Sequence, residues 1–122
     1  MGSHPVNLGA RFLLELCALA AGGYWGWARH RGALRVVAAI GVPLVLAVLW
    51  GTLAVPDDPS RSGHAPVPVP GILRLALELA VFGFASWALH HAGHTALSLV
   101  LAGMVILHYV VSHDRVAWLV RQ

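Results

Sequence analysis

The chain is short, strongly apolar and weakly charged. It has 122 residues, of which 58% are hydrophobic and only 11% are charged, and its mean hydropathy is +0.74. A soluble domain of this length could not cover so much apolar surface, so the composition excludes an ordinary soluble fold. The net charge is +3, and most of the arginines lie near the ends of apolar segments. This position favours lipid headgroups over nucleic acid as acidic partners.

Four apolar segments follow one another along the chain, at about 8–27, 34–55, 71–89 and 95–112. Each approaches the roughly 20 residues that span the hydrocarbon core of a bilayer. Short polar breaks at 28–33 and 90–94 predict tight helical hairpins. We therefore predict an all-α membrane protein with four transmembrane helices, arranged as two repeated helical hairpins over about 8–55 and 71–112.

The connector between the hairpins, 56–70, reads PDDPSRSGHAPVPVP. Its proline, glycine and aspartate predict an irregular surface loop, and 113–122 is expected to be a C-terminal tail. Because each hairpin crosses the membrane twice, both chain ends should lie on the side of this loop. The predicted location is the bacterial cytoplasmic (inner) membrane as a multi-pass protein. The arginines are divided almost evenly between the two membrane sides, so they indicate the orientation only weakly. We expect both termini to be cytoplasmic.

A charged motif recurs at an offset of 63 residues. The string R-x-x-L-E-L occurs at 11–16 and again at 74–79, so that Arg11 and Glu15 align with Arg74 and Glu78. The same offset aligns further apolar positions in the second helix of each hairpin. The recurrence predicts an internal duplication that places the two glutamates at similar depth.

Glutamates inside an apolar segment need an explanation, because an ionised carboxylate in hydrocarbon costs several kcal/mol. In one interpretation Arg11 neutralises Glu15 and Arg74 neutralises Glu78 locally, as pairs four residues apart on a helix, or an equivalent pairing joins neighbouring helices. In the other, the two glutamates lie close together and share a proton, which supplies a Brønsted acid shielded from water. The sequence leaves both open.

Several aromatic and polar residues could complete such a site. Trp50 and Phe82 could wall a pocket beside the acids, where aromatic faces would stabilise a cation, or they could simply fill the core. Trp25 lies on the helix face of Glu15, farther along the helix. His108 could orient a carboxylate or relay a proton, or could form a hydrogen bond between helices, and Tyr109 follows it.

The histidines give a weaker signal. His90 and His94 share one helix face, and His91 and His30 lie near the same predicted membrane side, but no cysteine or carboxylate accompanies them. Interfacial polar residues account for them adequately. We therefore expect no metal site and no cofactor.

Three strings carry a resemblance to a known family. They are RFLLELCALAAGGYWGW at 11–27, VLWGTLAVP at 48–56 and RLALELAVFG at 74–83, with a weaker match in HDRVAWLVRQ at 113–122. Together they resemble the YrdB-like family of small bacterial membrane proteins over nearly the whole chain. Proteins similar to this type are associated with cyclising the terpene chain of prenylated indoles, so the resemblance implies a small membrane-bound terpene cyclase.

The expected function is therefore a metal-independent, proton-initiated cyclase acting on a lipophilic substrate such as a farnesyl-indole. Glu15 or Glu78 would protonate an alkene or epoxide, and Trp50 and Phe82 would stabilise the carbocations. Two alternatives stay open: a proton- or cation-coupled binding or transport protein, and a purely structural or partner-binding protein. The expected partners are the bilayer and the substrate, without nucleic acid, and a second copy could complete the cavity.

Overall fold

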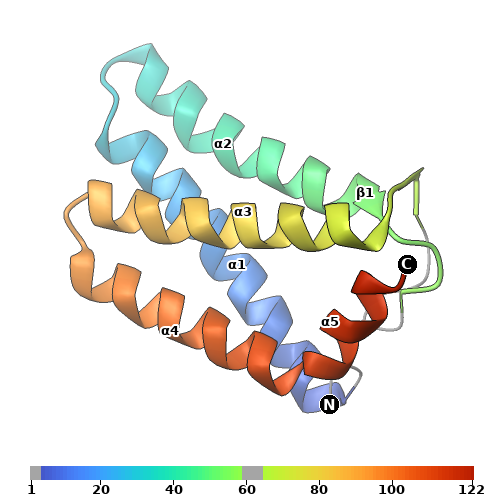
Figure 1. Cartoon of the computed structure of the whole chain (residues 1–122). Coiled ribbons are helices and arrows are strands. Elements are labelled where there is room, and N and C mark those ends of the chain that lie inside the picture. Colours follow the sequence, from blue (N-terminus) through green and yellow to red (C-terminus); the bar gives the residue numbers. More distant parts are fainter. Residues whose placement is uncertain (1–3, 59–64) are drawn as a thin grey trace.

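A computed structural model describes residues 4–58 and 65–122. Five helices account for most of the described residues, and Figure 1 labels them in chain order. They are α1 (Pro5–Ala28), α2 (Ala33–Thr52), α3 (Gly71–His91), α4 (Thr95–Val111) and α5 (His113–Val120). Two short strands, β1 (Leu53–Ala54) and β2 (Val67–Pro68), pair in parallel at the two ends of the connector.

The helices form two hairpins whose turns lie at the same end of the molecule. Figure 1 shows both turns on the left, and the connector with both chain ends on the right. The turn glycines Gly32 and Gly93 have φ values of 63° and 94°, which favour glycine over residues with a Cβ atom. The prediction of an all-helical fold is confirmed.

The core lies between α1, α3 and α4. Ala18 and Ala21 of α1 face Ala85 of α3, with Phe82 and Leu101 completing the same cluster. Small side chains let helix backbones approach closely, which is how helices associate where water supplies no hydrophobic driving force.

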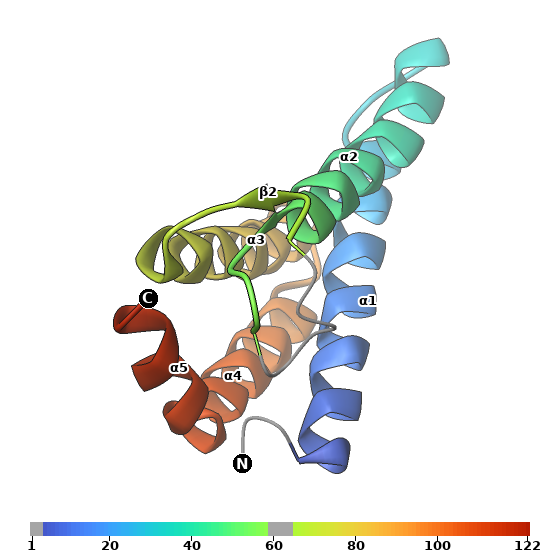
Figure 2. The same ribbon diagram turned by 90° about the vertical axis from the view of Figure 1, so that its right-hand side faces the viewer.

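Helix α2 lies at the edge of the bundle and contains no buried residue. It packs mainly along α1, and Figure 2 shows it diverging from α3 toward its outer end. The closest approach is at Gly26 of α1, where a Cβ atom would lie 2.6 Å from the backbone carbonyl of Ala38. The hairpin between α1 and α2 therefore depends on the absence of a side chain at this position.

Gly26→Ala should destabilise the protein by about 1–3 kcal/mol, because the added methyl group meets backbone atoms that cannot rotate away. Gly83→Ala on α3 is the matched control: a Cβ there meets nothing within 4 Å, so alanine should be neutral or stabilise the helix by up to about 1 kcal/mol. Denaturant unfolding of both variants in micelles measures the difference. Equal stabilities would contradict the α1–α2 packing.

The surface of the bundle suits hydrocarbon rather than water. Large apolar side chains such as Val37 and Ile40 on α2, and Leu99 and Ile106 on α4, are exposed. Three helices, α1, α2 and α3, are long and apolar enough to cross a membrane. A fourth span is counted only when α4 is taken together with α5, to which it is bent by 73°. These long apolar helices indicate membrane association.

Two sequence predictions differ from the structure. Residues 113–122 were expected to be a tail, but most of them form α5, which turns back from the end of α4 toward the start of α3 (Figure 2). Leu119 is buried there, and its carbonyl lies where a Cβ atom of Gly71 would be. The connector was expected to be a surface loop, yet Asp58 is buried; the middle of the connector, 59–64, lies outside the described residues.

Candidate functional site

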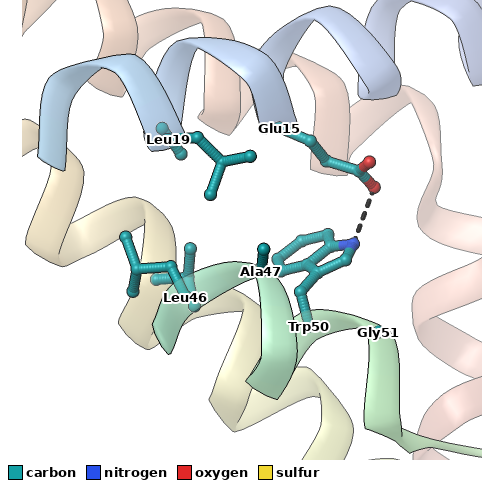
Figure 3. Close-up of a pocket in the computed structure, with 8 residues that line it drawn as sticks. Glu15, Leu19, Leu46, Ala47, Trp50 and Gly51 are labelled. Atoms are coloured by element: carbon teal, nitrogen blue, oxygen red, sulfur yellow. Dashed lines mark hydrogen bonds between the residues drawn. The ribbon is translucent and has the colours of Figure 1, made fainter. Parts of the chain in front are cut away.

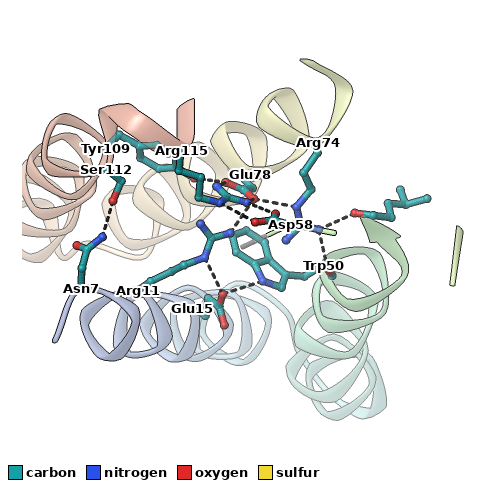
Figure 4. A network of polar contacts seen from close by, with 11 residues as sticks. Asn7, Arg11, Glu15, Trp50, Asp58, Arg74, Glu78, Tyr109, Ser112 and Arg115 are labelled. Atoms are coloured by element: carbon teal, nitrogen blue, oxygen red, sulfur yellow. Dashed lines mark hydrogen bonds and ion pairs between the residues drawn. The ribbon is translucent and has the colours of Figure 1, made fainter. Parts of the chain in front are cut away.

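The centre of the candidate site is Glu78 of α3, whose side chain is 0% exposed. Its carboxylate accepts hydrogen bonds from three arginines and one tyrosine, drawn in Figure 4. The donors are Arg11 Nη2 at 2.7 Å, Arg74 Nε at 2.8 Å, both terminal nitrogens of Arg115 at 2.8 Å, and the Tyr109 hydroxyl at 2.7 Å. The Arg115 contact is bidentate, the geometry that gives guanidinium–carboxylate pairs their strength.

Two further acidic side chains, Asp58 and Glu15, belong to the network. Asp58 is buried and is held by Arg115, with Nε at 3.3 Å and Nη2 at 2.7 Å. Glu15 lies beside Arg11. Three arginines thus meet three carboxylates: Arg11, Arg74 and Arg115 with Glu15, Asp58 and Glu78. Pairing each guanidinium group with an acidic side chain is what permits so many polar groups to be buried together.

Arg115 joins the connector to the helices. Burial lowers the pKa of its guanidinium, but the hydrogen bonds and charges of Glu78 and Asp58 outweigh burial, and the pKa lies above its ordinary value. The side chain is therefore a permanent cation that ties α5, α3 and the start of the connector together.

Helix α1 presents its polar residues every four positions, on one face. Asn7 Nδ2 donates to Ser112 Oγ at 2.6 Å, Arg11 reaches Glu78, and Glu15 accepts from Trp50 Nε1 at 2.8 Å. This spacing follows the helical repeat, so one stripe of α1 contacts the α4–α5 corner, then α3, then α2. The stripe fixes the registry of α1 against the other helices.

Arg74 closes the end of α2. Its Nη1 donates to the carbonyl oxygens of Trp50 and Leu53, both at 2.6 Å, which are among the last carbonyls of that helix and its extension. Its guanidinium also lies 4.7 Å from the centroid of the Trp50 ring. Arg74 thereby holds the Trp50 ring in place while it neutralises Glu78.

Glu15 differs from Glu78 because it faces a cavity. Its side chain is 24% exposed, and its Oε1 accepts from Trp50 Nε1 at 2.8 Å and from Arg11 Nε at 3.4 Å. Among the described residues, its Oε2 has no hydrogen-bond partner. The cavity, of about 130 Å³, lies between α1 and α2 and is almost wholly apolar (Figure 3). Its lining is Glu15, Ala18, Leu19, Leu46, Ala47, Trp50, Gly51 and Val81.

The structure gathers some predicted residues and separates others. Phe82 lies in the core behind the site, with its ring edge-to-face with Trp50 at 5.4 Å and with Tyr109 at 6.2 Å. Trp25 lies near the hairpin turns, where its Nε1 donates to His91 Nδ1 at 2.9 Å, away from the ion network. His108 lines a different cavity, between α1 and α4. Both pairs spaced four residues apart do form, but Arg11 binds Glu78 more closely than Glu15.

Sequence reasoning missed Asp58 and Arg115. Asp58 was read as part of a surface loop, and Arg115 as a residue near a helix end. The available signal was the string H-D-R-V-A-W-L-V, which places Arg115 and Leu119 four residues apart, on one face of a short amphipathic helix.

Comparison with known proteins places the chain in a family. A family described as "Protein of unknown function (DUF2568)" matches residues 9–106. The chain belongs to this family. It is also 38% identical over 119 residues to "Uncharacterized protein YrdB" of Bacillus subtilis (strain 168). The alignment covers 98% of this chain and 97% of the relative. No solved structure matches. The resemblance to YrdB-like proteins is thus confirmed, and the matched region includes both R-x-x-L-E-L strings.

Proposed function

We propose that this member of the DUF2568 family is a multi-pass protein of the bacterial cytoplasmic membrane and that it acts on a lipophilic, unsaturated substrate there. Helices α1 to α4 would cross the bilayer, and α5 would lie at its surface. Support comes from the length and hydropathy of the helices and from the exposed apolar side chains around the bundle. Helix α4, with 17 residues, is at the lower limit for a span.

The proposed activity is proton-initiated cyclisation of a prenyl chain, with Glu15 as the acid. One observation carries it: Glu15 lines an apolar cavity together with the Trp50 ring, whereas the side chains of Glu78 and Asp58 are 0% and 1% exposed. A cavity of about 130 Å³ is close to the roughly 150 Å³ that accommodates benzene in a protein core. It can therefore receive the terminal five-carbon unit of a prenyl chain, with the rest of the chain in the lipid.

The chemistry follows from the two oxygens of Glu15. A proton carried on Oε2 passes to the terminal alkene, so that the O–H bond breaks and a C–H bond forms, which leaves a tertiary carbocation. The next alkene attacks this cation and closes the ring. Trp50 Nε1 and Arg11 Nε, both directed at Oε1, stabilise the carboxylate produced. Loss of a proton from the final cation to this carboxylate restores the acid, so the reaction is an isomerisation that needs no other reactant.

Glu78 takes a supporting role in this proposal. Three guanidinium groups surround it, and its side chain is sealed from both lipid and water. It holds Arg11, and Arg11 orients Glu15. The sequence left open which glutamate acts as the acid; this proposal assigns the role to Glu15 and a supporting role to Glu78.

The activity is tested with membranes that contain the protein and a farnesyl-indole substrate. Glu15→Gln should lower cyclisation at least about 100-fold, because the amide keeps the shape and a hydrogen-bond acceptor but carries no transferable proton. Asp57→Asn, at an exposed carboxylate of the connector, should leave the rate unchanged. Cyclisation by Glu15→Gln at the wild-type rate would reject Glu15 as the acid.

A transport function is less well supported. A proton or cation passing Glu15 would next meet Glu78, which is enclosed by three arginines that repel cations. Proton flux into liposomes that Glu15→Gln abolishes, together with no cyclisation by the wild type, would reverse this preference.

A further inference from the structure

A second polar position lies inside the bundle, apart from the Glu15 cavity. His108, in the last turn of α4, is 6% exposed, and neither of its ring nitrogens has a hydrogen-bond partner among the described residues. An imidazole always carries at least one N–H donor, and its neutral form also carries an acceptor. Buried polar groups are almost always satisfied, so an unsatisfied ring calls for a specific explanation.

His108 lines a cavity of about 250 Å³ between α1 and α4. The first turns of α1 form one wall and the last turns of α4 form the other. The lining is Asn7, Ala10, Leu13 and Leu14 with Met104, Leu107, His108 and Val111. The walls are apolar apart from Asn7 and His108, so the cavity combines an oily surface with two polar groups, the arrangement typical of small-molecule sites.

Asn7 has hydrogen-bonding capacity to spare. Its Nδ2 donates to Ser112 Oγ at 2.6 Å, and its Oδ1 has no partner among the described residues. The cavity therefore offers the acceptor of Asn7 together with the donor and the acceptor of His108. A hydroxyl group, which both donates and accepts, matches this set.

The surrounding charges favour a neutral ligand. His108 lies in the field of Arg11, Arg115 and Glu78. Those charges are already matched within the ion network, so an added ion would be buried without a counter-charge. The apolar walls favour a hydrocarbon tail, and a cavity bordered by the outer faces of two helices lets that tail extend along them.

We infer that the α1–α4 cavity is a binding site for a neutral amphiphile with a hydroxyl head group, held by His108 and Asn7. The site is separate from the proposed cyclase cavity, which lies between α1 and α2. It requires no reaction, so it can be tested without reference to turnover.

The test uses 1-decanol, with decane as the matched tail without a head group. Met104 lines the cavity and is one of only two methionines in the chain, so ¹³C-methyl methionine labelling gives a reporter that is simple to assign. In phosphatidylcholine nanodiscs, decanol should move the Met104 signal at a mole fraction roughly threefold to tenfold lower than decane does, as expected for one net hydrogen bond. Equal mole fractions would overturn the inference.

Two variants test whether the His108 ring causes the preference for decanol over decane. His108→Leu should lose most of the preference for decanol, because only the Asn7 acceptor remains, whereas His108→Gln, which keeps a donor and an acceptor, should retain more of it. An undiminished preference for decanol in His108→Leu would also overturn the inference. If His108→Leu does not fold, the ¹⁵N signals of the wild-type histidine ring decide: decanol must shift one of them while decane must not.

Discussion

Glu78→Gln is expected to lower the free energy of unfolding by about 3–5 kcal/mol, the usual cost of removing one partner from a buried ion pair. Three guanidinium groups donate to the Glu78 carboxylate, so the variant would leave them buried around a neutral amide, with Asp58 as a remaining buried carboxylate. Arg11 and Arg74 would both lose the fully buried carboxylate that they bind.

Glu15→Gln is the control, because Glu15 occupies the equivalent position of the repeated motif. It should cost no more than about 1 kcal/mol: Arg11 keeps Glu78, and the amide oxygen can still accept from Trp50 Nε1. Unfolding of both variants in mixed micelles with increasing dodecyl sulfate gives the comparison. Similar losses in the two variants would mean that the network is not centred on Glu78.

Arg115→Met is expected to produce the next largest effect, a loss of about 3 kcal/mol. Arg115 is the link between α5, the buried Asp58 of the connector and Glu78. Without its charge, α5 would retain mainly the packing of Leu119 against the start of α3, where Gly71 permits close approach.

A double-mutant cycle isolates the Arg115–Asp58 pair. Asp58→Asn and Arg115→Met are measured singly and together, and the coupling energy should lie between about 1 and 3 kcal/mol, as is found for charged neighbours that share a network. Exchange of backbone amides in α5 should rise in each single variant. Strictly additive losses would show that the contact contributes nothing to stability.

The sequence was sufficient to predict the helices because their signals are local. Long apolar segments broken by short polar turns determine α1 to α4, and the ends fall within a few residues of the prediction. The recurring R-x-x-L-E-L string contains four of the six charged residues of the ion network, Arg11, Glu15, Arg74 and Glu78. Both strings do form Arg–Glu pairs four residues apart.

The unequal roles of the two glutamates could not be predicted in this way. Two glutamates at equivalent positions of a repeat can still have different neighbours. Here Arg115 binds Glu78 of α3 and also holds Asp58 beside it. These contacts join residues 37 and 57 positions apart. They depend on the bend between α4 and α5, which hydropathy does not reveal.

The sequence also does not distinguish an aromatic residue that lines a cavity from one that fills the core. Trp50 and Phe82 are both large and apolar, and both lie near a glutamate. Only the packing distinguishes them: α2 lies at the edge of the bundle, so Trp50 lines a cavity, whereas Phe82 of α3 faces the core.

The central claim is that Glu78 is sealed within the ion network while Glu15 faces an apolar cavity. The chain contains only these two glutamates, so their reaction with dicyclohexylcarbodiimide, which reaches protonated carboxyl groups from the apolar phase, can be read directly by peptide mass spectrometry. In intact membranes we predict an adduct on Glu15 and none on Glu78. An adduct on Glu78, or an unmodified Glu15, would contradict the account.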